Sequence, residues 1–244
     1  SPGRNEIVVR VVHESPNSRW YSGAGIYRNV WLRMYPDTHI AADGIYISTS
    51  CRDDDAWVVD VETEVALGQG SENGLGRFSV RHRVLDASGS TVAEAKSEVA
   101  GSGTSDRIAR VRASIPVSQP QLWDLSQPCR YRLVTELLEG ETVTMTESNV
   151  FGFRALTFDS QRGFYLNGRH VKLHGVCQHH DLGCLGAAVH RAALRRQIAL
   201  LQEMGVNAIR TAHNMPAVEL MELADEMGVL IVSEAFDMWE RKKT

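Results

Sequence analysis

LLQEMGVNAIRT at 200–211 and LADEMGVLIVSE at 223–234 are two versions of one pattern, and this pattern decides the fold of the C-terminal part of the chain. Each begins with the end of an amphipathic helix, passes through Glu-Met-Gly-Val, and continues as an apolar strand that ends in polar residues. Parallel strands need a crossover between them, and a helix usually supplies it. The repeat therefore predicts a β/α barrel or a doubly wound sheet.

The surrounding sequence extends this pattern over residues 155–244. Strands are expected at three places, 170–176, 206–211 and 229–234. A helix is expected over 189–204, with Gly205 as its C′ residue, and Pro216 is expected in the first turn of a second helix. The expected apolar helix faces comprise Leu194, Ile198, Leu201 and Met204, then Leu220, Leu223, Ala224 and Met227. A closed (β/α)8 TIM barrel has eight strands and eight helices over about 250 residues. The sequence thus predicts a partial TIM barrel and a chain that is part of a larger protein.

The first 155 residues have a different pattern, in which short β-branched or aromatic runs are separated by turn signals. Val59, Val61, Thr63, Val65 and Leu67 illustrate the period-2 alternation of a half-buried strand. The expected strands are 6–13, 25–35, 44–50, 57–67, 77–86, 91–100, 108–117 and 131–140. Strands at this spacing are typical of a β-sandwich. Residues 118–128 contain two prolines around Trp123, which suggests a crossover loop with one buried aromatic side chain.

The composition is that of a soluble globular protein, with 43% hydrophobic and 23% charged residues among 244. The net charge of −4 gives no general attraction to nucleic acid or anionic membranes. No apolar run approaches the roughly 18 residues of a spanning helix, and no signal peptide is visible. The four cysteines are too sparse for a disulfide scaffold, so free thiols are expected. The expected location is the bacterial cytoplasm or periplasm.

Polar side chains recur where the expected parallel strands end. These residues are His179, His180 and Asp181 after the first strand, Arg210, Thr211, His213 and Asn214 after the second, and Glu234 and Asp237 after the third. Because ligand-facing residues of β/α barrels lie at the carboxyl ends of the strands, we expect these side chains to line one site.

A metal centre and a nucleophilic site are the other chemistries to consider there. The three neighbours His179, His180 and Asp181 rarely all point inward, and no His-Glu-x-x-His pattern is present. Glu234 and Asp237 lack further ligands to complete a cation shell. No nucleophile elbow or phosphate-binding loop is recognisable. We therefore expect no metal and no cofactor.

Four stretches together resemble glycoside hydrolase family 2, the β-galactosidase and β-glucuronidase type enzymes. They are SRWYSGAGIYRNVWL (18–32), FYLNGRHVKLHGVCQHHDLGCLG (164–186), MGVNAIRTAHNMP (204–216) and DEMGVLIVSEAFDMW (225–239). The resemblance implies the end of a sugar-binding jelly-roll β-sandwich at 1–36, an immunoglobulin-like β-sandwich at 37–154, and the start of the catalytic TIM barrel at 155–244. The last boundary agrees with the change of pattern near residue 155.

The resemblance also implies a reaction, the hydrolysis of terminal β-linked sugars with retention. Such enzymes use two glutamates about 5 Å apart, one as acid/base and one as nucleophile. In this family both lie on later barrel strands, so neither is expected in this chain, which alone should be inactive. A homo-oligomeric full-length protein is compatible with the resemblance. β-Galactosidase, β-glucuronidase and β-mannosidase activities stay open, as does a non-catalytic carbohydrate-binding fragment.

What the resemblance carries over to this chain is the binding of a β-linked oligosaccharide or glycoside. His179 and His213 match histidines of family motifs and are expected to hydrogen-bond sugar hydroxyls, with Asp181 as a further contact. Residues expected to contribute less directly are His180, Asn214, Glu234 and Asp237. Arg19 is either a substrate contact or a packing residue between domains, and Trp239 is either a sugar-stacking platform or part of the barrel packing.

Overall fold

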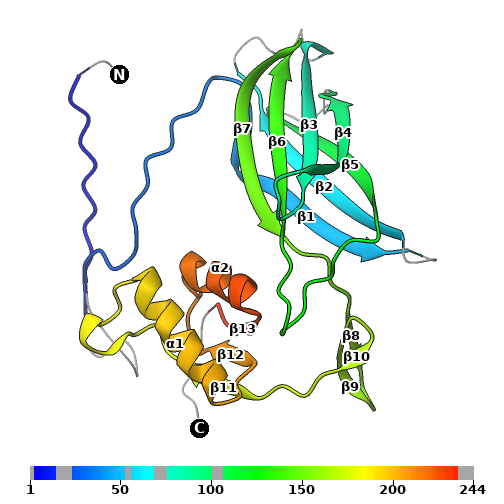
Figure 1. Ribbon diagram of the computed structural model, residues 1–244. Helices are drawn as coiled ribbons and strands as arrows, with labels where there is room; N and C mark the ends of the chain where they lie inside the picture. Colours follow the sequence, from blue (N-terminus) through cyan, green and yellow to red (C-terminus); the bar gives the residue numbers. More distant parts are fainter. Residues whose placement is uncertain (1–2, 15–23, 53–55, 69–75, 101–106, 236–244) are drawn as a thin grey trace. The chain divides into compact units, whose positions relative to one another are not determined.

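The computed structural model describes residues 3–14, 24–52, 56–68, 76–100 and 107–235, and it is mostly β with few helices (Figure 1). The chain divides into two compact units. One comprises the described residues within 32–174 and 224–230, and the other those within 1–31, 175–223 and 231–244. Within the described ranges, no helix is long and apolar enough to cross a membrane.

The larger unit contains two antiparallel sheets. In the first, the order is β1-β2-β5, formed by β1 (His39–Cys51), β2 (Ala56–Ala66) and β5 (Ile108–Ser118). In the second, the order is β4-β3-β6-β7, formed by β3 (Phe78–Leu85), β4 (Thr91–Glu98), β6 (Tyr131–Glu139) and β7 (Thr142–Phe151). The core between them joins residues of both sheets, such as Val59, Ile115 and Leu133, so this part of the chain is a β-sandwich.

The period-2 alternation of β2 explains how this sandwich forms. Val59, Val61, Thr63 and Val65 are all buried, as the alternation predicts. The intervening acidic side chains face outward, where Glu62 accepts a hydrogen bond from Arg112 at 2.6 Å. Burying apolar surface stabilises a fold by about 25 cal/mol for each Å² removed from water. A strand with one apolar face is therefore stabilised most when that face packs against a second sheet.

The six sequence-predicted strands between residues 44 and 140 are confirmed, whereas those at 6–13 and 25–35 are wrong. Residues 6–13 contain no strand in the structure, and Ile7 is 87% exposed. Strand propensity was correct as a local signal, but a strand forms only by pairing, and the described part of the chain offers 6–13 and 25–35 no paired neighbour. The sequence prediction also missed β7, whose alternating residues are mostly polar.

A third, smaller sheet follows the sandwich within the same unit. Its order is β10-β9-β8, formed by β8 (Leu156–Asp159), β9 (Gly163–Leu166) and β10 (Arg169–His170). Trp123, from the loop between β5 and β6, is only 2% exposed and packs against Leu166 and Val171. The prediction of one buried aromatic residue in that loop is therefore confirmed.

The fourth sheet contains the strands that the repeated pattern predicts. Its order is β11-β12-β13, formed by β11 (Gly175–Gln178), β12 (Ala208–Thr211) and β13 (Leu230–Ser233), with β11 and β12 parallel. Helix α1 (Arg191–Glu203) connects β11 to β12, and α2 (Val218–Met227) connects β12 to β13. The helical crossovers predicted from the repeat are confirmed.

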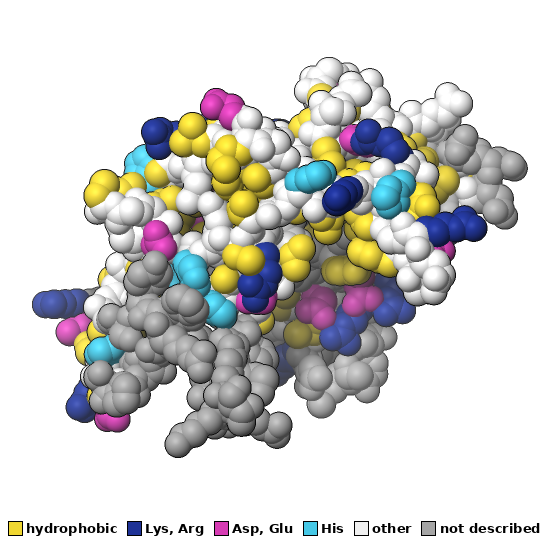
Figure 2. Space-filling model, turned by 90° about the horizontal axis from the view of Figure 1, so that it is seen from below, with side chains coloured by type: hydrophobic (Ala, Val, Ile, Leu, Met, Phe, Trp, Pro, Cys, Tyr) yellow, Lys and Arg dark blue, Asp and Glu magenta, His cyan; other side chains and the backbone are white. Residues whose placement is uncertain are grey.

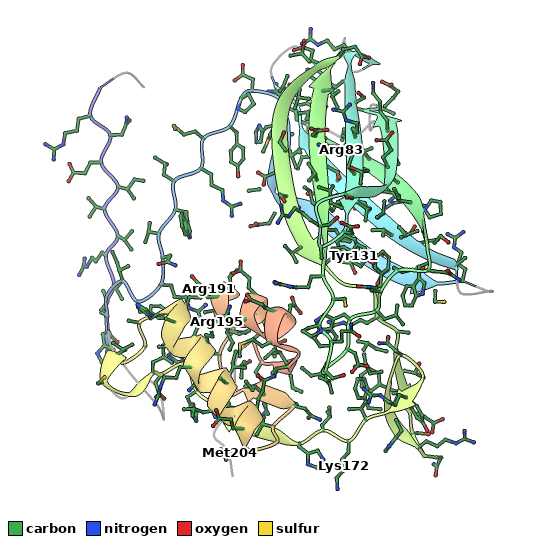
Figure 3. All side chains as sticks on the ribbon, viewed as in Figure 1. Arg83, Tyr131, Lys172, Arg191, Arg195 and Met204 are labelled. Atoms are coloured by element: carbon green, nitrogen blue, oxygen red, sulfur yellow. The ribbon has the colours of Figure 1, made fainter. Side chains whose placement is uncertain are left out.

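Details of these elements differ from the sequence predictions. The expected strand at 170–176 is two separate strands, β10 and β11. Met204 is 75% exposed because it is the C-cap of α1 (labelled in Figure 3) and not part of its buried face, while Gly205 follows at φ +83° as expected of a C′ glycine. Pro216 precedes α2 by two residues and so lies outside its first turn, contrary to the expectation; the first bond of the helical i to i−4 type runs from Met221 N to Ala217 O.

A buried histidine makes the stability of the sandwich depend on pH. His82 of β3 is fully buried, with Nδ1 3.0 Å from Thr135 Oγ1, and burial lowers its pKa to about 4. In the unfolded chain His82 takes up a proton with its ordinary pKa of 6.5, whereas in the folded chain it stays neutral until pH falls to about 4. We therefore expect the free energy of unfolding to fall by about 2 kcal/mol between pH 7 and pH 5, measured by urea denaturation.

The variant His82→Gln tests this assignment because glutamine does not titrate. Its free energy of unfolding should change less between pH 7 and pH 5 than that of the wild type. His190→Gln, at an exposed position, is the matched control and should keep the wild-type pH dependence. Equal pH dependence in His82→Gln and wild type would contradict the prediction.

Candidate active site at the strand ends

The parallel pairing of β11 with β12 sets two histidines side by side. Gln178 and Thr211 are register partners, and the pairing continues one step further through a 2.8 Å hydrogen bond from Ala212 N to Gln178 O. The residues that follow, His179 and His213, therefore leave the sheet at the same edge. Their ring centroids are 5.3 Å apart with an interplanar angle of 35°.

His213 lies on a turn held by Glu234. Its φ of +69° is in the left-handed region, and its amide N donates to Glu234 Oε2 at 2.6 Å. Arg210 donates through Nε (2.8 Å) and through Nη2 to the other carboxylate oxygen, Oε1. The bond from the His213 amide has the largest effect and lowers the pKa of Glu234; burial opposes it, and Arg210 lowers the pKa further. Glu234 is therefore ionised at neutral pH.

The loop after β11 places His180 and Asp181 beside this pair. Burial lowers the pKa of His180, and the positive charge of Arg28 lowers it further. A neutral imidazole has one donor and one acceptor nitrogen, which suits it to bind hydroxyl groups. Asp181 is half-buried and its Oδ1 lies 3.5 Å from the amide of Gly183, at the start of a 3₁₀ turn, Gly183–Leu185.

Residues 24–31 also belong to this unit, and they contact the loop after β12. Arg28 Nη2 donates to the Met215 carbonyl at 2.6 Å, and Asn29 Nδ2 donates to Glu219 Oε1 at 2.6 Å. The Tyr27 ring lies 6.2 Å from the ring of His180. Sequence reasoning gave these residues no role in the site. The available signal was the polar Arg28-Asn29 pair, which interrupts an apolar run that would otherwise read as a strand.

A small cavity lies under the loop after β11. Its volume is about 50 Å³, and its lining includes Arg28, His179, His180, Asp181 and Asn214 together with apolar side chains such as Leu194 and Leu220. Ligand sites for small molecules usually measure about 300–1,000 Å³. This cavity is therefore too small to hold such a ligand by itself.

Three of the expected site residues cannot be placed. Arg19, Asp237 and Trp239 lie outside the described residues. Within the described ranges, no group of three or more His, Cys, Asp or Glu side chains is arranged to hold a metal ion. Cys177 is exposed and accepts a hydrogen bond from Arg210 Nη1 at 3.3 Å. On the face drawn in Figure 2, histidine side chains reach the surface beside hydrophobic groups.

Comparison with known proteins identifies the family. The model described as "Glycosyl hydrolases family 2" matches residues 38–154, and that described as "Glycosyl hydrolases family 2, TIM barrel domain" matches residues 159–238. The chain belongs to glycoside hydrolase family 2. The resemblance seen in the sequence motifs is confirmed.

The relatives compared here are much longer than this chain of 244 residues. Beta-galactosidase BoGH2A of Bacteroides ovatus is 43% identical over 98% of this chain, which spans 28% of that protein. A beta-glucuronidase of Bacteroides fragilis is 29% identical over 86% of this chain, which spans 30% of that protein. The crystal structure of a family 2 member from Bacteroides cellulosilyticus matches with a TM-score of 0.86 and 35% identity, over 93% of this chain and 29% of that one.

The contact made by Arg28 gives a testable consequence for this family 2 chain. In Arg28→Ala the Met215 carbonyl loses its donor, which should lower the free energy of local opening of this loop by about 1 kcal/mol. We expect amide hydrogen exchange in residues 213–220 to become about 3- to 10-fold faster. Arg33→Ala, which removes an exposed ion pair with Asp43, is the control. Equal exchange in the two variants would show that Arg28 does not order this loop.

Proposed function

We propose that this chain is part of a retaining exo-β-glycosidase of the β-galactosidase type. The convergence of His179 and His213 at one edge of the parallel sheet carries this proposal, because both side chains can bind sugar hydroxyls there. The 43% identity to a protein named beta-galactosidase supports it. The chain spans 28% of that relative, so the activity belongs to a longer protein.

In this proposal the strand ends hold one face of the terminal sugar. His179 and His213 exchange hydrogen bonds with hydroxyl groups, and the Asp181 carboxylate accepts from a further hydroxyl. His180 and Asn214 complete this side of the sugar, while Arg19, Asp237 and Trp239 are proposed further contacts. Hydrogen bonds of this kind can strengthen as the oxocarbenium-like transition state forms, so they contribute to rate as well as to binding.

The two catalytic glutamates are proposed to lie outside these 244 residues. The one Asn-Glu pair in the chain, Asn5-Glu6, precedes the sandwich, and Glu234 is bound to Arg210 and to the amide of His213. Retention requires two carboxyl groups about 5–5.5 Å apart, one protonating the leaving oxygen and the other attacking the anomeric carbon.

The proposed domain organisation is the end of a jelly roll at 1–36, an immunoglobulin-like sandwich at 37–154 and the start of a TIM barrel at 155–244. The buried ring of Tyr131, at the start of β6 (Figure 3), supports the middle assignment. Its hydroxyl accepts a 2.9 Å hydrogen bond from the amide of Gln121, ten residues upstream. A tyrosine that bonds back to the upstream backbone at this corner is typical of immunoglobulin-like sandwiches.

A β-glucuronidase of the same family is the second candidate function. The 29% identity to a protein named beta-glucuronidase supports it, over 86% of this chain. The two activities differ at the sugar C6, where glucuronides carry a carboxylate. Arg28, in the lining of the small cavity, is a cation that such a carboxylate could approach.

Turnover assays distinguish these possibilities. The full-length protein that contains this chain should hydrolyse nitrophenyl β-galactoside faster than nitrophenyl β-glucuronide. The isolated 244-residue chain should show no turnover, because it lacks both glutamates. Turnover by the isolated chain would contradict the placement of the glutamates, and preference for the glucuronide would favour the second candidate.

The role of His179 is tested in the full-length protein. His179→Ala should lower kcat/KM by about 10- to 100-fold, the effect of losing one or two hydrogen bonds in the transition state. His190→Ala removes an exposed histidine whose side chain makes no capping bond to α1, and it should leave kcat/KM unchanged. An unchanged kcat/KM in His179→Ala would remove His179 from the site.

A further inference from the structure

The turn after β12 holds a non-glycine residue in a conformation that side chains disfavour. His213 has a φ of +69°, and left-handed non-glycine residues persist only where the surrounding structure holds them. The His213 side chain is only 14% exposed. The direction of its ring is therefore set by the turn on which it lies.

Glu234 ties this turn to the neighbouring strand. Its own amide, directly after β13, donates to Thr211 Oγ1 at 3.1 Å. Its carboxylate then reaches across to accept the His213 amide at 2.6 Å through one oxygen, and Arg210 through the other. The two sides of the turn, Thr211 and His213, are thus both bonded to Glu234.

The same bonds restrict what Glu234 can do for a sugar. Each of its oxygens already accepts a hydrogen bond from a protein donor, and its side chain is 27% exposed. These bonds use most of the roughly four acceptor positions of a carboxylate, and little of it remains for a sugar hydroxyl. Its carboxylate also lies 4.0 Å from His213 Nδ1, on the imidazole that the turn presents beside His179.

We propose that Glu234 is a positioning residue, which holds His213 in its left-handed conformation and aims the imidazole toward the sugar beside His179. Arg210 fixes the second carboxylate oxygen, so that the first remains directed at the His213 amide. This inference rests on the proposed glycosidase function for its kinetic consequences, while its geometric content is independent of that function.

Glu234→Gln is the sharpest variant because it keeps the shape of the side chain. A glutamine amide has an acceptor oxygen on one side and a donor NH2 group on the other, so either Arg210 or the His213 amide would face a donor in place of its present acceptor. Glu222→Gln is the matched control, since Glu222 forms an exposed ion pair with Arg191 between the two helices and does not bond to the turn after β12. The control should keep wild-type kinetics.

The kinetic test is a double-mutant cycle in the full-length protein, with nitrophenyl β-galactoside as substrate. Glu234→Gln and His213→Ala should each lower kcat/KM by about 10-fold or more, and the double variant should be no slower than His213→Ala alone. Multiplicative losses would show that Glu234 acts independently of His213, as a direct sugar contact does. Unchanged kcat/KM with a lowered Tm would assign it a structural role only, and either result overturns the proposal.

A structural test separates this inference from the proposed reaction. Crystal structures of the full-length wild type and Glu234→Gln should show His213 left-handed and bonded to Glu234 in the first, and a displaced His213 ring in the second. An unmoved His213 ring in Glu234→Gln would refute the positioning role, whatever the enzyme hydrolyses. If the wild type hydrolyses neither glycoside but the His213 ring moves, the proposed function fails while the positioning role stands.

Discussion

The site depends on the parallel register that pairs Gln178 of β11 with Thr211 of β12. Parallel strands end at the same edge, so one register choice decides that His179 and His213 emerge together. A shift by one residue would turn every side chain of one strand to the other face. The helix between the strands supports that register. Ile198 of α1 is fully buried, and Gly205 lets the chain turn directly from the helix into β12.

The sandwich achieves its order through a different constraint, the burial of one face of each strand. On β2 the same alternation that buries Val59 and Val61 sends Glu62 outward to Arg112. Surface ion pairs of this kind add little stability, so the buried face decides the structure. His82 and Thr135 are polar exceptions in that interior, and each has the other as a hydrogen-bond partner.

Sequence reasoning succeeded where local pattern and tertiary packing agree. The repeated Glu-Met-Gly-Val unit predicted the helices and strands around β12 and β13, because both periodicity and the glycine position are local signals. It could not predict the ion pair between Arg210 and Glu234, because no local pattern pairs two residues 24 positions apart. The strand predicted at 25–35 was wrong because its long-range contacts were likewise not visible in the local pattern. The segment has strand propensity, but Arg28 and Asn29 instead bind the loop and the helix after β12.

The apolar residues near the N-terminus have a consequence for handling the protein. Ile7, Val8 and Val9 are each about 80% exposed or more, in an extended segment with unsatisfied strand propensity. Such a segment offers its backbone and its apolar side chains to any other chain that can add to it as a strand. The isolated 244-residue chain is therefore prone to self-association through residues 6–13, and its solubility should depend on concentration more steeply than its net charge of −4 suggests.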